Sequence, residues 1–314
     1  MWYYYLIGAV LFLLMLVLFV SYICYRKVFY SKPRVPLPEG EYGLPRAPEY
    51  RPHYDELRGW IDLYRTLPSE ELEITSFDGL KLRGRYFERE KGAVTELLFH
   101  GYRGSGERDM SAGIERCFAL GRNALIVDER ASGRSEGHVI TFGINEYRDC
   151  LSWIDFAVKK FGEEVKLIIS GVSMGAATVM IAAGEKLPKN VVCALADCGY
   201  STARDIIKKV IREMHLPADL MYPFVKLGGL VFGRFNIDAT SPKKALAHAT
   251  IPVIFIHGDI DGFVPCDMSR ELYEICTSKK KLTVIDGAEH ALAYPTNKEK
   301  YLCALSDFKT ECGF

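Results

Sequence analysis

Residues 167–178 read Leu-Ile-Ile-Ser-Gly-Val-Ser-Met-Gly-Ala-Ala-Thr, and this stretch decides the fold. An aliphatic run ends at a Gly-x-Ser-x-Gly motif, and small residues that a helix tolerates follow it. The pattern predicts a buried parallel strand that turns sharply into a helix, with Ser173 at the bend. Gly171 and Gly175 suit so tight a turn, because a Cβ at either position would meet neighbouring backbone. The motif alone also occurs by chance in glycine-rich loops. The prediction of a strand-to-helix turn therefore depends on the strand pattern before the motif and the helix pattern after it.

The position predicted for Ser173 makes it a candidate nucleophile. At the bend its side chain would be exposed above the sheet, at the N-terminus of the following helix. The positive end of the helix dipole and the free N–H of Met174 favour a negatively charged oxygen there.

Length and composition exclude several classes of function. A chain of 314 residues can form one large α/β domain with appendages. Lys plus Arg and Asp plus Glu number 40 each, so no positive field would attract nucleic acid. The nine cysteines are scattered without zinc-ligand spacing, which predicts free thiols in a reducing compartment and no metal.

The first 30 residues predict a transmembrane anchor. Residues 2–25 carry no charged side chain, and about 20 apolar residues span a hydrocarbon core of roughly 30 Å. Aromatic residues lie at both ends, as in an interfacial belt. A cleaved signal peptide is disfavoured, because no basic segment precedes the apolar run and no small-residue cleavage site follows it.

Charge asymmetry predicts the orientation of this single-pass anchor. Arg26, Lys27, Lys32 and Arg34 follow the apolar run, and no Lys or Arg precedes it. The positive-inside rule then places the catalytic domain in the cytoplasm. The opposite topology stays open, because one short segment decides it.

The rest of the chain divides into a linker and a globular domain. Residues 31–53 hold six of the 14 prolines and predict a semi-rigid spacer. A helical spacing over 54–66 and a hairpin around Asp78-Gly79 open a domain that runs over 54–314. Beyond residue 94, strands and helices alternate, which predicts a mostly parallel sheet with helices on both faces. The predicted strands are 95–99, 124–128, 166–170, 192–196, 252–257 and 281–285.

An insert over 200–248 interrupts this alternation. Amphipathic stretches at 201–214 and around 218–232 predict two helices, with Pro217 and Pro223 as breaks. The insert could be a helical hairpin packed on the sheet. We favour a cap whose apolar side faces Ser173 and shapes an acyl pocket, because the insert leaves the sheet at the edge where α/β sites lie.

A serine nucleophile needs a base and an acid that orients the base. Among the seven histidines, His290 follows the last predicted strand and is the candidate base. His100 and His257 each precede a glycine at a strand end and fit a turn or packing role, whereas His138 lies in a loop that could border the site. The candidate acids are Asp259 and Asp261, after the preceding strand, and Asp197; spacing does not choose between the first two.

Four motifs in residues 70–312 resemble the α/β-hydrolase superfamily, in particular its serine aminopeptidase-like and monoacylglycerol-lipase-like branch in bacterial membrane-anchored form. They are Phe-His-Gly-Tyr-Arg-Gly at 99–104, Asp-Glu-Arg-Ala-Ser-Gly-Arg-Ser-Glu-Gly at 128–137, the Ser173 turn, and His-Gly-x-x-Asp-x-x-Val-Pro at 257–265. The resemblance implies that Asp261 is the acid and that the backbone N–H groups of Tyr102 and Met174 form an oxyanion hole. The order Ser173, Asp261, His290 is that of this superfamily.

The resemblance implies a serine hydrolase that needs no cofactor and forms an acyl-enzyme on Ser173. We expect a small-molecule acyl substrate, an ester more than an amide, and a lipophilic one given the predicted anchor. Two alternatives stay open: a serine peptidase of the aminopeptidase-like type, and a non-catalytic membrane-tethered binding protein on the same fold. The sequence does not indicate an oligomeric state.

Overall fold

A computed structural model describes residues 1–32, 38 and 40–314 of the chain. Within these residues, eight strands form one sheet in the order β1-β2-β4-β3-β5-β6-β7-β8. Strands β3 to β8 run parallel, whereas β1 and β2 form an antiparallel hairpin at one edge. The strands are β1 (Glu70–Thr75), β2 (Lys81–Phe87), β3 (Thr95–Phe99), β4 (Asn123–Val127), β5 (Leu167–Val172), β6 (Val191–Asp197), β7 (Val253–Gly258) and β8 (Lys280–Ile285). The predicted parallel sheet with an N-terminal hairpin is confirmed.

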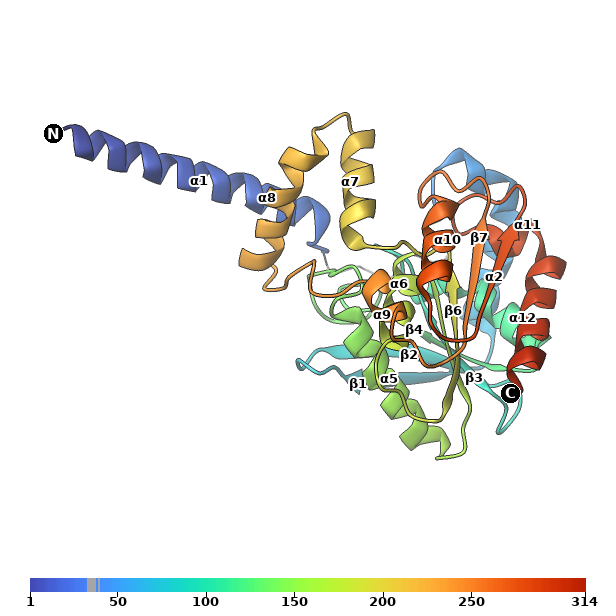
Figure 1. Cartoon of the computed structure of the whole chain (residues 1–314). Helices are drawn as coiled ribbons and strands as arrows, with labels where there is room; N and C mark the ends of the chain where they lie inside the picture. Colours follow the sequence, from blue (N-terminus) through green and yellow to red (C-terminus); the bar gives the residue numbers. More distant parts are fainter. Residues whose placement is uncertain (33–37, 39) are drawn as a thin grey trace.

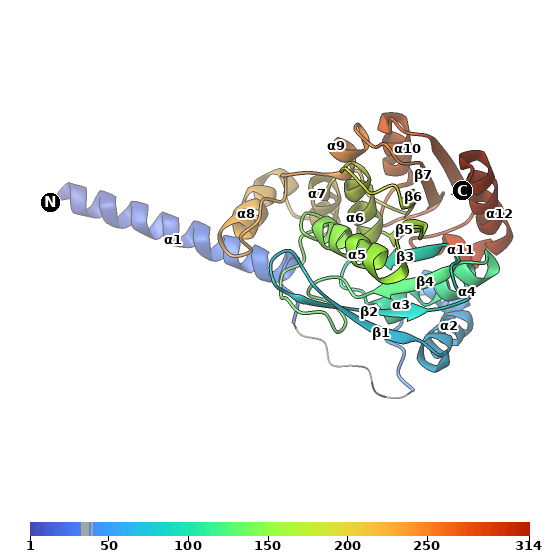
Figure 2. The same cartoon turned by 90° about the horizontal axis from the view of Figure 1, so that it is seen from below.

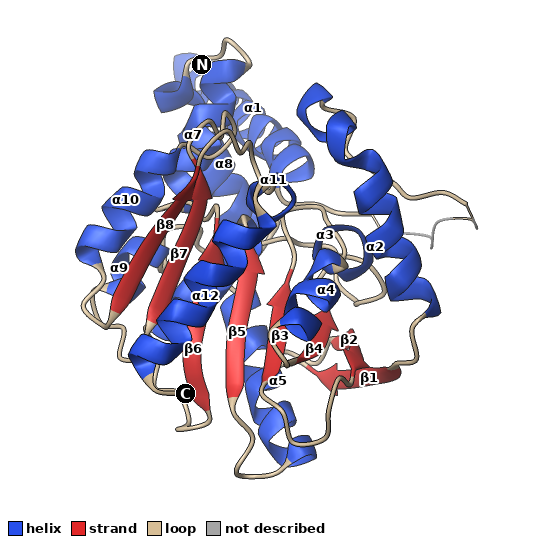
Figure 3. Cartoon of the chain, turned by 90° about the vertical axis from the view of Figure 1, so that its right-hand side faces the viewer, coloured by secondary structure: helices blue, strands red, loops and turns tan. Residues whose placement is uncertain are grey.

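Helices cover both faces of the sheet (Figure 3). One face packs against α5 (Glu146–Phe161), α6 (Met174–Ala183), α9 (Pro242–Leu246) and α10 (Cys266–Ile275). The other packs against α2 (Tyr54–Thr66), α3 (Gly106–Met110), α4 (Ala112–Ala119) and α12 (Lys298–Cys312), with α11 (Ala293–Thr296) before α12. Every residue of β3 and β4 is buried, as a strand covered on both faces requires.

The turn between β5 and α6 has the predicted geometry. Ser173 has a φ of 56°, in the left-handed region that a residue with a side chain seldom adopts. A Cβ at Gly171 would lie 2.1 Å from the carbonyl carbon of Gly175, and a Cβ at Gly175 would lie 2.1 Å from the carbonyl oxygen of Phe99. The two glycines therefore allow the backbone contacts that hold the serine in this conformation.

The N-terminal helix α1 (Trp2–Val28) is long and apolar enough to cross a membrane, and its first two-thirds extend away from the domain (Figures 1 and 2). Its last turns pack into the domain, where Ser21, Cys24, Tyr25 and the following Phe29 are buried. The chain then passes through the predicted linker, of which residues 33–37 and 39 lie outside the described residues. A short 3-10 helix, η1 (Pro48–His53), ends the linker.

The insert contains the two predicted helices, α7 (Ala203–Glu213) and α8 (Ala218–Val231). Pro217 lies directly before α8, but Pro223 lies inside it, so the predicted break at Pro223 is wrong. Burial of Tyr222 and Val225 on either side of the proline anchors the helix. This packing offsets the one intrahelical hydrogen bond that a proline cannot donate.

Replacement of Gly175 tests the close contact behind the serine turn. We expect Gly175→Ala to lower the free energy of unfolding by roughly 3 kcal/mol, because backbone of β3 cannot move away from the added methyl group. Gly59→Ala is the matched control: Gly59 lies in α2, and a Cβ added there would meet no atom within 4 Å, so alanine should raise stability by up to about 1 kcal/mol. Urea unfolding of the full chain in detergent measures both, and equal stability of the two variants would contradict the expectation.

Candidate active site

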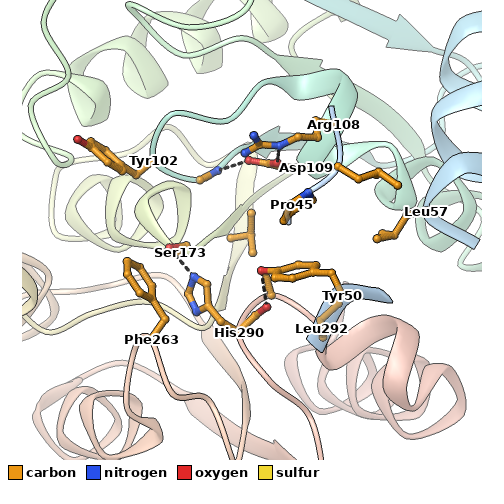
Figure 4. A pocket seen from close by; sticks show the side chains of 14 residues that line it. Pro45, Tyr50, Leu57, Tyr102, Arg108, Asp109, Ser173, Phe263, His290 and Leu292 are labelled. Carbon is orange, nitrogen blue, oxygen red and sulfur yellow. Dashed lines mark hydrogen bonds and ion pairs between the residues drawn. The ribbon is translucent and has the colours of Figure 1, made fainter. Parts of the chain in front are cut away.

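The three residues expected to carry the chemistry come from three loops at the carboxyl edge of the parallel strands. Ser173 lies between β5 and α6, Asp261 in the loop after β7, and His290 in the loop between β8 and α11. Loops at this edge of an open α/β sheet converge on one crevice. Figure 4 shows Ser173 and His290 facing each other across that crevice.

A continuous chain of hydrogen bonds joins the three side chains. Nε2 of His290 lies 3.0 Å from Oγ of Ser173, and Nδ1 of His290 lies 2.7 Å from Oδ2 of Asp261. A carboxylate only accepts, so Nδ1 of His290 carries the proton and Nε2 is free to accept from the serine hydroxyl. This is the arrangement in which an imidazole can take a proton from a serine.

Asp261 is held as a carboxylate. Its Oδ1 accepts hydrogen bonds from the backbone N–H groups of Phe263, at 2.9 Å, and Val264, at 2.8 Å. Burial alone would raise the pKa of Asp261, but hydrogen bonds and attraction from His257 and His290 hold that pKa well below its usual value. The group therefore stays ionised at any pH near neutrality and fixes the orientation of the His290 ring.

The other two candidate acids lie elsewhere. Oδ1 of Asp259 accepts from the backbone N–H of Gly287 at 2.6 Å on the surface, and does not contact His290. Oδ2 of Asp197 accepts from the hydroxyl of Tyr301 at 2.9 Å, and burial raises the pKa of Asp197. The geometry thus places only Asp261, of these three, against the candidate base.

His257 has a part in the site that the sequence did not predict. Its Nε2 lies 3.1 Å from Oδ2 of Asp261 and 2.8 Å from the carbonyl oxygen of Val264, so this nitrogen donates. Its Nδ1 lies 2.6 Å from Oγ of Ser269, which donates in turn. His257 is a positioning residue for Asp261 rather than only a turn residue. His257 lies at the end of β7 and Asp261 four residues later, in the loop that follows. This short spacing is the sequence signal that could have indicated a contact between the two side chains.

The loop after β3 forms the wall beside the serine. The structure places Tyr102 on the cavity that Ser173 also lines, and Met174 in the first turn of α6, where backbone N–H groups have no acceptor within the helix. Oδ2 of Asp109 accepts from the N–H of Gly101 at 3.3 Å and pins the start of this loop. The hydroxyl of Tyr102 donates to the carbonyl of Val28, at the end of α1, over 2.7 Å.

A cavity of about 260 Å³ opens beside Ser173 and His290. Apolar side chains line much of it: Leu44, Pro45, Leu57, Val172, Phe263 and Leu292. The hydroxyl of Tyr50, in the predicted linker, donates to the carbonyl of His290 over 2.9 Å. The linker is therefore more than a spacer, since it forms one wall of the cavity.

The insert over 200–248 does not shape this cavity. Among the described residues, none of the lining side chains comes from it. Its apolar side chains share one buried cluster with the end of α1 and with Met174, the residue after Ser173. The expectation of a cap that shapes an acyl pocket stays a prediction. His138 stacks on Tyr30, with ring centroids 5.9 Å apart, rather than bordering the site.

One group of potential metal ligands lies at the site within the described residues: Cys198, Asp261 and His290. The two ring nitrogens of His290 already face Ser173 and Asp261, as described above. Burial raises the pKa of Cys198, so its thiol stays protonated and is a poor metal ligand. The arrangement suits proton transfer better than metal binding.

Comparison with known proteins places the chain among distant relatives. No family model matches it. It is 28% identical over 190 residues to the uncharacterized protein YqkD of Bacillus subtilis, a match that spans 60% of this chain and 62% of YqkD. It is 26% identical over 219 residues to protein bem46 of Schizosaccharomyces pombe, spanning 68% of this chain and 67% of bem46.

Solved structures show the same fold. The esterase Pf2001 of Pyrococcus furiosus superposes with a TM-score of 0.67 and 22% identity over 90% of this chain and 98% of that enzyme. The α/β hydrolase domain-containing protein 10 of mouse superposes with a TM-score of 0.55 and 18% identity, over 77% and 99% of the two chains. The resemblance to the α/β-hydrolase superfamily is thus confirmed at the level of the fold.

Separate replacement of Asp259 and Asp261 by asparagine tests which carboxylate orients His290. We expect Asp261→Asn to lower kcat/KM for a p-nitrophenyl ester by about 10⁴-fold, because an amide facing Nδ1 of His290 no longer holds the productive tautomer. Asp259→Asn, two residues away on the surface, is the matched control and should keep wild-type activity. A larger loss in the Asp259 variant than in the Asp261 variant would assign the orienting role to Asp259 instead.

Proposed function

We propose that this chain is a membrane-anchored serine hydrolase that cleaves a small ester through an acyl-enzyme. The single observation that carries the proposal is the hydrogen-bonded series Asp261–His290–Ser173, which ends at a serine held in a left-handed backbone conformation beside a cavity. In this proposal Ser173 is the nucleophile, His290 the general base and Asp261 the acid that orients it.

The reaction proceeds in two steps. His290 takes the proton of Ser173 through Nε2 while Oγ attacks the ester carbonyl, and the same nitrogen then protonates the leaving alkoxide. Water, deprotonated by His290, next attacks the acyl carbonyl carbon. The bond from that carbon to Oγ of Ser173 breaks, Nε2 of His290 returns the proton to Oγ, and the carboxylic acid is released. The N–H groups of Tyr102 and Met174 stabilise the oxyanion in both steps, each contributing roughly 3 kcal/mol to the transition state.

Two observations favour an ester of apolar character over a peptide. The cavity beside Ser173 is lined largely by apolar side chains, which bind an acyl or alkyl chain better than charged peptide termini. Solved structures with this fold include two proteins described as esterases, Pf2001 of Pyrococcus furiosus and EaEST of Exiguobacterium antarcticum. Est1E of Butyrivibrio proteoclasticus, with the same fold, was solved with bound ferulic acid.

The packing of α1 supports an uncleaved anchor. Phe29 is fully buried against Phe142 and Phe235, with ring centroids 6.0 and 5.0 Å away. Removal of this segment with a signal peptide would expose that aromatic cluster to water. The cytoplasmic orientation remains a prediction from the basic residues after the apolar run.

Active-site labelling tests the proposed nucleophile. We expect a fluorophosphonate probe to label the full chain in detergent and Ser173→Ala to abolish the labelling, because the probe reacts with an activated serine hydroxyl. Ser152→Ala, on α5, is the control and should label like the wild type. No labelling of the wild type would favour the non-catalytic binding protein.

The choice between ester and amide needs a substrate panel. We expect turnover of p-nitrophenyl acyl esters with a dependence on chain length, since the apolar cavity would bind part of the acyl chain. Turnover of aminoacyl amides without any preference among esters would instead indicate the aminopeptidase-like alternative. Initial rates of the wild type and Ser173→Ala measure both.

A further inference from the structure

Helix α8 presents an apolar stripe to solvent. We call this stripe the outer face of α8; it consists of Leu220, Pro223, Phe224, Leu227, Leu230 and Val231. Their spacing of three and four residues places them on one side of a helix. Leu220, Leu230 and Val231 are 63%, 44% and 46% exposed. Pro223 is also exposed, whereas Phe224 and Leu227 are half-buried. An exposed apolar stripe of this kind marks a surface that binds a membrane or a protein partner.

An adjoining side of α8 fixes this helix against the N-terminal helix. A Cβ at Gly228 would lie 2.5 Å from the carbonyl oxygen of Ser21 and 3.2 Å from Tyr25, so the backbones touch. The ring of Phe232, just after α8, packs edge-on against Tyr22 at 5.2 Å. Both views of the cartoon show α8 beside the last turns of α1 (Figures 1 and 2).

Further bonds hold the end of α1 in the domain. The N–H of Ile140 donates to the carbonyl oxygen of Phe29 over 2.8 Å. The hydroxyl of Tyr102 donates to the carbonyl oxygen of Val28. Because α1 and α8 are both fixed to the domain, the outer face of α8 keeps one orientation relative to α1.

The distance along α1 from Trp2 to its contact with α8 matches the thickness of a bilayer's hydrocarbon core. From Trp2 to Ser21 a helix rises roughly 28 Å at 1.5 Å per residue, about the thickness of the hydrocarbon core. If Trp2 lies at one surface of a bilayer that α1 spans, the contact at Ser21 and Tyr22 lies at the other surface, between hydrocarbon and headgroups. Arg26 and Lys27 are exposed one turn further along, and Arg234 is exposed just beyond α8. Their charges suit phospholipid headgroups.

We propose that the outer face of α8 lies in the interfacial region of the same bilayer that α1 crosses, with Leu230 and Val231 in contact with acyl chains. This inference rests on the proposed membrane anchor and extends it. The domain would then sit against the membrane in one fixed orientation, held by a spanning helix and an interfacial helix together, rather than moving freely on a tether.

Site-specific fluorescence in vesicles tests this proposal. The full chain is prepared with Cys303→Ser and Cys312→Ser, which removes the two cysteines that are not buried. Leu230→Cys, or Leu227→Cys in a second preparation, is labelled with an environment-sensitive dye in phosphatidylcholine–phosphatidylglycerol vesicles. We expect a blue-shifted emission that a lipid with a quencher near its headgroup extinguishes.

Two control positions make the outcomes distinct. Leu14→Cys, in the middle of α1, reports on the span and should be extinguished by a quencher near the end of the acyl chain. Native Cys303, on α12 at the opposite side of the molecule, is exposed and should report water in a Cys312→Ser chain.

Lipid quenching at position 14 together with water-like emission at 227 and 230 would overturn the inference while leaving the anchor intact. Blue-shifted emission at 227 and 230 that no lipid quencher reaches would also overturn it, because a protein or a second copy would then cover the face. An absence of lipid quenching at 14 would overturn the anchor and the inference together. Ester hydrolysis is measured on the same samples, so that loss of the proposed activity is recorded separately.

Discussion

The constraint on which the rest of the structure depends is the close approach of three backbone segments behind Ser173. The carbonyls of Phe99 and Gly175 occupy the space that a side chain at Gly175 or Gly171 would need. This contact holds the serine in a left-handed conformation, at the point where β5 ends and α6 begins. Buried strands on both sides keep it there, since β3 pairs with β5 as far as Gly171 and β6 as far as Val172. The left-handed φ of Ser173 costs free energy at this one residue, and the packing of the paired strands offsets that cost.

Around this turn, the charge of one carboxylate organises the polar contacts. Asp261 receives two backbone N–H groups and lies against two imidazoles, His257 and His290. Such a group would be costly to bury alone, and these partners replace the water it loses. Because His257 and the backbone hold Asp261, the ring of His290 has one favoured orientation, with Nε2 toward Ser173. Proton transfer then requires little rearrangement of the protein, which is the basis of the function that we propose.

The segments before residue 54 pack as part of the α/β domain. The last turns of α1 and the ring of Phe29 share a buried hydrophobic cluster with α7 and α8, and the hydroxyl of Tyr50 donates to the backbone carbonyl of His290. The hydroxyl of Tyr102 joins the end of α1 to the loop beside the serine. A displacement of α1 relative to the domain would therefore break this hydrogen bond or move the loop that carries Tyr102. This coupling gives a physical reason for a fixed orientation at the membrane.

The sequence by itself determined the elements of the fold and most of the candidate site. Short-range patterns were sufficient for the strands, the serine turn and the apolar N-terminal helix, because each depends on residues adjacent in the chain. Resemblance placed the acid at Asp261, a choice that spacing had left open. Only the tertiary structure decided which segments line the cavity and which side chains support Asp261. The contact between Tyr50 and His290 joins residues 240 positions apart, and α8 packs on α1 across a similar interval. A periodic pattern within one helix or strand does not predict such pairs. They form when distant segments of the chain pack together and bury apolar surface.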